Sequence, residues 1–320
     1  MRRQRAASID LDEIPSPKDL ERRSSCEKDF RLFCETYRPD VFHFGWSPDH
    51  LKVIESIESV VLGGGLINLA MPRGTGKTSL SITAAMWALL YGHRRWVCLV
   101  GATGGKAEAL LKSIKTEFRF NPKLFEDFPE VCVPIRALEG RPARALSQTV
   151  QGIPTAIQWN MDKLVLPSIE SSVNSGSTVS VCGITGDIRG QQETTIDGTI
   201  IRPDLCIIDD PQTRESAASE KQCNDRIETI MGDILGLAGP GVRIACILPC
   251  TVIHQYDAVD RLLSDEFKDW ISFRTKMLYG KPKHPEAWEK YAVERDRILT
   301  NSLSLETLNE YYIEHRNVIL

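Results

Sequence analysis

The chain has 320 residues, of which 42% are hydrophobic and 26% charged, so it is long enough to bury the core of one large or two modest globular units and is not a disordered or fibrous protein. A formal net charge of −4 and a pI near 5.9 give no global sign of nucleic-acid binding. No apolar run approaches the roughly 20 residues that cross a bilayer, and no signal peptide follows the basic first residues, which predicts a soluble, intracellular protein.

The N-terminal third begins with a polar segment and then becomes apolar. Residues 1 to about 25 are charged and rich in serine and proline, which predicts a mobile arm, and regular structure is expected to begin near Phe30. Residues 66–72 predict a short buried strand that enters a glycine-rich turn. Residues 78–91 predict a helix that ends at Gly92.

A second strand and a second helix follow directly. Residues 95–102 are apolar enough for a buried strand, and residues 106–118 have the period of an amphipathic helix. The apolar side of this helix is expected to contain Ala109, Leu110, Ile114 and Phe118. Strand, turn, helix, strand and helix in this order predict a parallel sheet.

The rest of the chain continues the alternation of strands and helices. After an irregular stretch rich in proline and arginine, residues 161–168, 177–185 and 203–210 predict three strands. A long polar helix comes next, and the apolar residues 242–250 predict another central strand. From about Glu286 the spacing is helical again.

Nine cysteines are an odd number, and several lie in the strand-like runs, where a reduced thiol serves as a small core residue. These are Cys98, Cys182, Cys206 and Cys246. The cysteine spacings lack the second half of a zinc pattern, so the sequence predicts a reducing compartment and no structural zinc.

A phosphate-binding loop is predicted between the first strand and its helix. Glycines in this turn let backbone amides approach phosphate oxygens, and the helix N-terminus adds partial positive charge. Lys77 would bridge the β and γ phosphates of ATP, and Thr78 would place its hydroxyl on Mg²⁺. The remaining loop residues expected to hold nucleotide are Gly74, Thr75, Gly76 and Ser79. Met71 replaces the first glycine of the general pattern, and an ordinary turn with an exposed lysine is the alternative.

Two adjacent carboxylates end the strand predicted at residues 203–210. Asp209 and Asp210 follow four apolar residues and precede Pro211, at the sheet edge where open α/β sheets bind ligands. Asp209 is the expected partner of Mg²⁺, and Asp210 is expected to polarise the attacking water. A cation would offset the cost of two neighbouring like charges. A simple loop-starting turn is the alternative.

Two glutamates are reserve candidates for activating water, because a glutamate reaches one methylene further than an aspartate. They are Glu193 and Glu215.

These motifs define the predicted fold. We expect an α/β P-loop NTPase of the RecA- or ASCE-like kind, with a mostly parallel central sheet flanked by helices and a small helical subdomain. Residues 26–280 would form the ATPase core, and residues 281–320 a helical subdomain or linker.

With both motifs in place, the chain resembles the large terminase subunit of tailed bacteriophages, specifically its N-terminal ATPase part, from about Phe30 to Leu320. The stretches that carry the resemblance are MPRGTGKTS, KAEALLKSIKTEFRFNPKLFEDFP, GDIRGQ and RPDLCIIDDPQTRES. The resemblance implies ATP and Mg²⁺ as cofactors and a motor that couples ATP hydrolysis to movement of DNA into the procapsid. Helicase-like ATPases and a nucleotide-binding assembly switch that does not hydrolyse ATP are the alternatives.

The resemblance also implies a coupling motif after the strand at residues 242–250, where polar side chains sense the γ-phosphate. Thr251, His254 and Asp257 occupy its polar positions, and ordinary helix capping is the alternative. In the segment ahead of the phosphate loop, Trp46 and His50 stand where such enzymes pack on adenine, with simple core packing as the alternative.

An arginine within the phosphate loop is common in these enzymes, and Arg73 matches it as an arginine finger. Arg189 is a rival, and an arginine from a neighbouring subunit is a third choice.

The family's partners are double-stranded DNA, the portal protein, the small terminase subunit and further copies in a ring, in the host cytoplasm and without a membrane. Its second domain, a nuclease, is not expected in this chain, so we expect ATPase activity without cleavage. Local basic clusters are the candidates for gripping DNA, with ordinary solvated surface as the alternative. These clusters are Arg136, Arg141 and Arg144, or Arg94 and Arg95.

Overall fold

The computed structural model describes residues 9–170, 172–195, 198–277, 279–281, 284–300 and 305–319. The chain divides into two compact units, Met1–Thr275 and Lys276–Leu320, a few residues before the boundary predicted at residue 280.

An eight-stranded sheet organises the first unit. In spatial order its strands are β13 (Trp270–Arg274), β2 (Gly65–Ala70), β12 (Ala245–Cys250), β11 (Leu205–Asp209), β3 (Trp96–Gly101), β8 (Thr178–Gly183), β7 (Lys163–Val165) and β6 (Gln158–Trp159). The six strands from β13 to β8 are all parallel, and β7 and β6 add an antiparallel edge. The predicted α/β class with a mostly parallel sheet is therefore confirmed.

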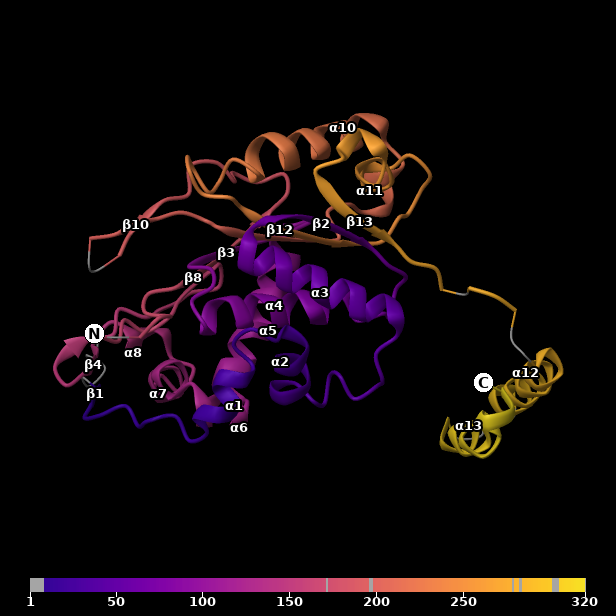
Figure 1. The fold of residues 1–320 in the computed structure, drawn as a ribbon, viewed down its shortest axis with the longest axis horizontal. Helices are drawn as coiled ribbons and strands as arrows, with labels where there is room; N and C mark the ends of the chain where they lie inside the picture. Colours follow the sequence, from indigo (N-terminus) through magenta and orange to yellow (C-terminus); the bar gives the residue numbers. More distant parts are fainter. Residues whose placement is uncertain are drawn as a thin grey trace, which may run out of the picture. The chain divides into compact units, whose positions relative to one another are not determined.

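Helices cover both faces of the sheet (Figure 1). One layer contains α2 (Phe30–Tyr37), α3 (Pro48–Gly63), α4 (Lys77–Leu90) and α5 (Gly104–Phe120). The opposite layer contains α10 (Glu220–Glu228), the π-helix η1 (Thr229–Ile234) and α11 (Ala258–Leu262). Burial of a sheet on both faces explains why its strands are continuous apolar runs.

Alternation along β11 decides which helix layer each of its side chains meets. Leu205 and Ile207 pack into the core on the α3 and α4 side, whereas Cys206 and Ile208 pack into the core on the α10 side. Because side chains alternate across a strand, Asp209 continues the first set and faces α4.

The four cysteines predicted in strands lie there, in β3, β8, β11 and β12, and all nine cysteines have free thiols. The amphipathic prediction for α5 is right except at Ala109, which is exposed, because Ala107 and Leu111 occupy the buried side with the other three residues.

The stretch predicted as irregular contains three short helices, each with proline in its first turn, where the missing N–H has no helical partner anyway. They are α6 (Pro122–Asp127), α7 (Pro129–Ala137) and α8 (Pro142–Ala145). The smaller elements are β1 (Ile9–Leu11), α1 (Leu20–Ser25), β4 (Gln148–Val150), β5 (Ile153–Pro154), β9 (Glu193–Thr194), β10 (Ile200–Ile201), α9 (Arg214–Ala217) and the 3-10 helix η2 (Asp265–Phe267).

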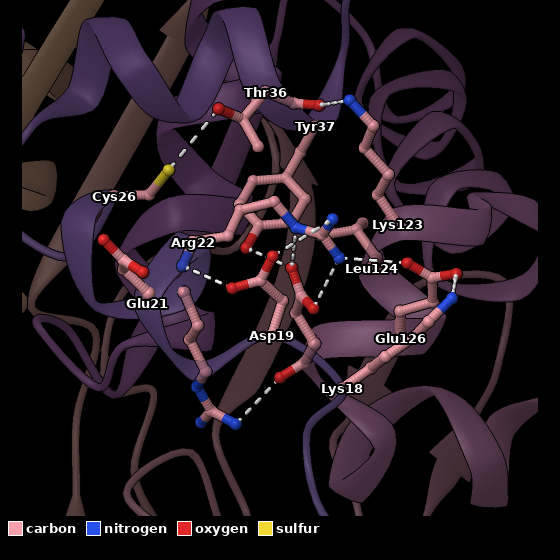
Figure 2. A network of polar contacts seen from close by, with 12 residues as sticks. Lys18, Asp19, Glu21, Arg22, Cys26, Thr36, Tyr37, Lys123, Leu124 and Glu126 are labelled. Atoms are coloured by element: carbon pink, nitrogen blue, oxygen red, sulfur yellow. Dashed lines mark hydrogen bonds and ion pairs between the residues drawn. The ribbon is translucent and has the colours of Figure 1, made fainter.

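The prediction of a mobile arm is wrong for residues 9–25. Strand β1 pairs with β4, and α1 is held against α6 by the polar network of Figure 2. Arg22 donates from Nε and Nη2 to the fully buried Asp127, at 2.6 and 2.7 Å, and the Tyr37 hydroxyl donates to the same carboxylate at 2.8 Å. These partners lie about a hundred residues apart, so no local pattern reveals them.

Replacement of Arg22 with alanine is expected to lower the free energy of unfolding by about 3 kcal/mol, because it leaves the Asp127 carboxylate buried without its cation. Urea denaturation measures this loss. The matched control is Arg31→Ala, since Arg31 forms only an exposed pair with Glu35 and its removal should cost about 0.5 kcal/mol or less. Equal losses in the two variants would contradict a buried ion pair.

The second unit contains α12 (Pro285–Thr300) and α13 (Leu305–Ile319), which pack on each other. Ile298 is fully buried, and the Tyr291 ring lies 5.9 Å from that of Tyr312. This agrees with the helical character predicted from Glu286 onward. Among the described residues, none of the helices has both the length and the apolar character to pass through a membrane.

Candidate functional site

The loop between β2 and α4 has the backbone of an anion-binding turn. Gly74 and Gly76 have left-handed φ angles of 83° and 79°, and added Cβ atoms would meet nothing within 4 Å, so conformation rather than space requires glycine at both. Gly76 is the N-cap of α4 and supplies no side-chain acceptor, unlike the caps of α2, α3 and α5. The first amides of α4 are therefore left for an anion.

Lys77 lies inside this loop. Its side chain is buried, and Nζ donates to the carbonyl oxygens of Met71 at 2.8 Å and Pro72 at 2.9 Å. Burial lowers the pKa of Lys77, and the nearby Asp210 and Asp209 carboxylates act in the opposite direction. Lys77 is thus not the exposed lysine of the alternative interpretation.

Thr78 and Asp209 meet at the edge of the sheet. The Thr78 hydroxyl donates to the two carboxylate oxygens of Asp209 at 3.0 and 3.2 Å. A hydroxyl and a carboxylate in contact are the hard oxygen ligands that Mg²⁺ accepts. The described residues contain no cluster of three or more His, Cys, Asp or Glu that would hold a metal, so a cation here needs phosphate or water oxygens as further ligands.

Burial raises the pKa of Asp209 from 3.8 to about 6, with the Thr78 hydrogen bond opposing and the Asp210 charge adding to the rise. The folded protein therefore binds the proton of the Asp209 carboxyl more tightly than the unfolded chain does. As pH rises from about 4 to about 6, this carboxyl loses its proton and the folded state becomes less stable, and above about pH 6 the whole of this loss is present.

In Mg²⁺-free buffer, Asp209→Asn is therefore expected to gain stability relative to the wild type as pH rises from 4 to 7, by about 1–2 kcal/mol after allowing for screening. Urea denaturation at pH 4.5, 6 and 7.5 gives the difference directly. A difference that does not change with pH would show that the carboxylate titrates normally.

Asp210 follows the end of β11 in a left-handed conformation, with φ of 42°, which is uncommon for a residue with a side chain and more frequent for Asp and Asn. Its amide donates to the carbonyl of Pro249 at 2.9 Å. Among the charges that act on Lys77, the Asp210 carboxylate has the largest effect. The second carboxylate thus lies beside the lysine of the loop.

Strand β12 lies between β2 and β11 and contacts the loops that follow both. The Cys250 carbonyl accepts the amide of Met71 at 3.1 Å, while Pro249 accepts that of Asp210. Thr251 comes next, and its buried hydroxyl oxygen has no hydrogen-bond partner among the described residues. This residue is therefore at the same edge as the loop and the carboxylates.

The other predicted coupling residues have different surroundings. His254 is exposed, and Asp257 accepts the amides of Ile253 and Asp260, the second of these as the N-cap of α11. Asp257 therefore caps a helix, as the alternative interpretation of this residue predicted.

Trp46 and His50 share a cavity of about 240 Å³ with the phosphate loop. Its wall includes Gly74, Thr75 and Gly76 of the loop together with the aromatic rings of Phe42, Phe44 and Trp46. An apolar, aromatic pocket next to an anion-binding turn suits a purine base joined to phosphates.

Hydrogen bonds orient both predicted side chains. His50 Nε2 donates to the carbonyl of Thr75 at 2.9 Å; its Nδ1 therefore accepts, in the neutral ring, from the Ser47 hydroxyl at 2.7 Å. The Trp46 indole donates to Glu35 at 2.6 Å. The start of α3 is thereby linked to the phosphate loop.

The predicted arginines differ in position. Arg73 is exposed on the phosphate loop, close enough to Lys77 to lower its pKa. Arg189 forms an ion pair of 2.8 Å with Asp233 of η1. Among the described residues, no hydrogen bond or ion pair joins Arg189 to the phosphate loop.

Among the described residues, neither reserve glutamate forms a hydrogen bond or an ion pair with Lys77, Thr78 or the acidic pair. Glu193 forms an ion pair with Lys163 of β7, three strands beyond β11, and Glu215 is exposed in the short helix α9. Asp210 remains the carboxylate with the largest electrostatic effect on Lys77.

Most arginines proposed to grip DNA have structural roles. Arg94 is buried and donates to backbone carbonyls that include Val61, and Arg136 donates to Asn121 while its guanidinium lies 3.8 Å from the Phe125 ring centroid. Arg144 pairs with Glu139, and Arg95 donates to Ser175. Arg141 is exposed.

Two residues near the site are not predicted from the sequence. Gln212 is buried, and neither its amide nitrogen nor its amide oxygen has a partner among the described residues. Lys106, in the first turn of α5, acts electrostatically on Asp209. The sequence contains only weak indications of these two residues. Gln212 follows the acidic pair by two positions, and Lys106 follows the strand whose Gly101 pairs with Asp209.

Comparison with known proteins leaves the site to be interpreted from its geometry: no protein-family model matches the chain, and no curated protein sequence matches it.

Proposed function

We propose that this chain is a Mg²⁺-dependent ATPase of the P-loop kind that serves as the motor of viral DNA packaging, as the N-terminal part of a large terminase subunit does. The observation that carries the ATPase proposal is the contact of the Thr78 hydroxyl with Asp209 at 3.0 Å beside the buried Lys77. A loop lysine, a hydroxyl and a carboxylate at one sheet edge are the parts that hold a nucleotide and its metal.

The order of the strands supports the finer fold proposal. An additional strand, β12, separates the strand of the phosphate loop from the strand of the carboxylates, as an ASCE-like fold requires. The loops of β2, β12 and β11 all leave the sheet at its carboxyl edge, where open α/β sheets bind ligands.

Each side chain then has a defined task. The amides of the loop and Lys77 hold the β and γ phosphates, and the aromatic cavity of Trp46 and His50 holds adenine. Thr78 and Asp209 hold Mg²⁺, which neutralises charge on the phosphate oxygens. Asp210 accepts the proton of the attacking water, and Arg73 stabilises the charge that develops on the γ-phosphate.

Gln212 is a second candidate for orienting the water, since an amide both donates and accepts hydrogen bonds and this one has both atoms unpaired among the described residues. Leaving them so costs roughly 1–3 kcal/mol per group. Water bound with the nucleotide would recover that cost.

Coupling to DNA would begin at Thr251, because the end of β12 contacts both the phosphate loop and Asp210. A change at the γ-phosphate would move the segment that leads to α11. The partners in this proposal are double-stranded DNA, the portal protein, the small terminase subunit and further copies in a ring, at the procapsid in the host cytoplasm.

Phosphate release by the purified chain tests the proposal. We expect Mg²⁺-dependent hydrolysis of ATP that EDTA abolishes, and a higher rate with double-stranded DNA and portal. Binding of ATP without release under all of these conditions would favour the assembly switch. Unwinding of a duplex by the chain alone would favour the helicase-like alternative.

A further inference from the structure

A second cavity, of about 460 Å³, lies on the outward side of α5. Its walls are α5, the turn between α7 and α8, and the turn between β6 and β7. Lys112, Lys115, Ala109, Gly140, Trp159 and Met161 are among its lining residues. We call it the α5 groove; it shares no lining residue with the cavity of Trp46 and His50.

Three cations follow one another along this side of α5. Lys112, Lys115 and Arg119 are spaced by three and four residues, which places them on a single helix face. Arg119 continues the row past the groove, where its guanidinium lies so close to Gly140 that a Cβ there would come within 2.6 Å of it.

No ion pair neutralises this row. Within the described residues no carboxylate forms an ion pair with Lys112, Lys115 or Arg119; Glu117 pairs with Arg38 and Glu139 with Arg144. Asp162 acts on Lys115, and Arg119 acts on Glu139, only through their charges. Glu108 is the only acidic residue among the described lining residues. Like charges at this spacing repel, so an anion that binds along the row stabilises it.

Lys115 is fixed at the base of the groove. Its ammonium donates to the backbone carbonyls of Asn160 and Lys163 and lies 4.9 Å from the centroid of the Trp159 ring. Burial lowers the pKa of Lys115 to about 8. A cation that has lost much of its water in an open groove gains more from an arriving anion than a fully hydrated one does.

The floor of the groove is apolar. Trp159 and Ala109 line it, and Met161 is 78% exposed at the turn between β6 and β7. A row of cations beside aromatic and apolar surface suits a strand with charged phosphates on one side and bases on the other. A duplex keeps its bases stacked inside, and the carboxylates of an acidic peptide, unlike the phosphates of a nucleotide strand, are not each accompanied by a flat ring for the floor.

We propose that the α5 groove binds single-stranded nucleic acid, with phosphodiester groups along Lys112, Lys115 and Arg119 and bases on Trp159 and Met161. This inference does not rest on the proposed ATPase. The two sites are nevertheless connected, because α5 begins directly after β3, whose Gly101 pairs with Asp209.

Fluorescence anisotropy of a labelled 20-nucleotide oligo-dT with the full chain tests the proposal. Lys112→Glu is expected to weaken binding about tenfold at low salt, because an exposed cation facing the phosphates becomes an anion. Lys221→Glu, at an exposed position on α10, makes the same change in net charge and should weaken binding less than about twofold. For Lys112→Ala, the slope of log affinity against log salt should fall by roughly 0.7.

Three results would overturn the assignment: equal effects of the two Glu variants, equal affinity for a duplex of the same length, or competition by polyglutamate as strong as that by unlabelled oligo-dT. The Lys77→Ala variant should bind oligo-dT as the wild type does. If the chain binds oligo-dT but does not hydrolyse ATP, only the proposed ATPase is rejected. If it hydrolyses ATP but does not bind oligo-dT, only the groove is rejected.

Discussion

The rate of phosphate release is expected to fall about 10²–10³-fold in Lys77→Ala. Enzymes lose this much activity when one preorganised group that stabilises developing charge is removed. The reason is the position of Nζ, which is buried within the loop and interacts electrostatically with both carboxylates. A malachite-green assay with saturating Mg²⁺ and ATP measures the loss.

Lys52→Ala is the matched control, since Lys52 is an exposed lysine on α3 and its removal should leave the rate unchanged. Thermal denaturation of both variants separates loss of chemistry from loss of folding. A folded Lys77→Ala protein that releases phosphate at the wild-type rate would remove the phosphate loop from the mechanism.

Asp210→Asn is expected to keep nucleotide binding and to lose about 10²–10⁴-fold in turnover, because asparagine has the same shape and cannot accept the proton of the attacking water. Asparagine also tolerates the left-handed backbone found at this position, so the change leaves the turn after β11 intact. Titration with a fluorescent ATP analogue and single-turnover hydrolysis measure the two properties separately.

Glu215→Gln makes the same chemical change at an exposed position in α9 and should leave turnover within about twofold of the wild type. If the Glu215 variant lost turnover and the Asp210 variant did not, the reserve glutamate would be the residue that activates water.

Much of the central sheet is predictable from short apolar runs. Strands β3, β11 and β12 and most of β2 are buried on both faces, so each appears in the sequence as a largely hydrophobic segment. The proximity of Thr78 and Asp209 follows from the same pattern, since the carboxyl ends of parallel strands meet at one edge.

Elements that depend on distant partners are not predictable in this way. Strand β13 exposes most of its side chains, and only its pairing with β2 makes it a strand. Helix α1 is polar and is held by Asp127, more than a hundred residues away. Local propensity does not encode such contacts, and the order of the strands in the sheet is equally non-local.

The residues of the candidate site also differ in whether their contacts are local or distant in the sequence. His50 reaches the loop through its hydrogen bond to the Thr75 carbonyl, and Trp46 is held by Glu35, so both contacts lie within the first 75 residues. The ion pair of Arg189 with Asp233 instead depends on how η1 packs. Gln212 is not predictable from the sequence, because burial of both its amide atoms depends on the packing around it, which its sequence neighbours do not reveal.

The order of the strands also determines when the sheet edge that carries the candidate site is complete during synthesis. Strand β2 leaves the ribosome early, but the residues of its neighbours β12 and β13 that pair with it are made 180 and 204 residues later, at the cost of a long loop closure. Until then the phosphate loop has no strand on either side and Asp210 has no carbonyl to receive its amide. A nascent chain that ends before residue 245 should therefore be unable to retain ATP. The contact of α1 with Asp127 can form much earlier, since Asp127 is made over a hundred residues before that point.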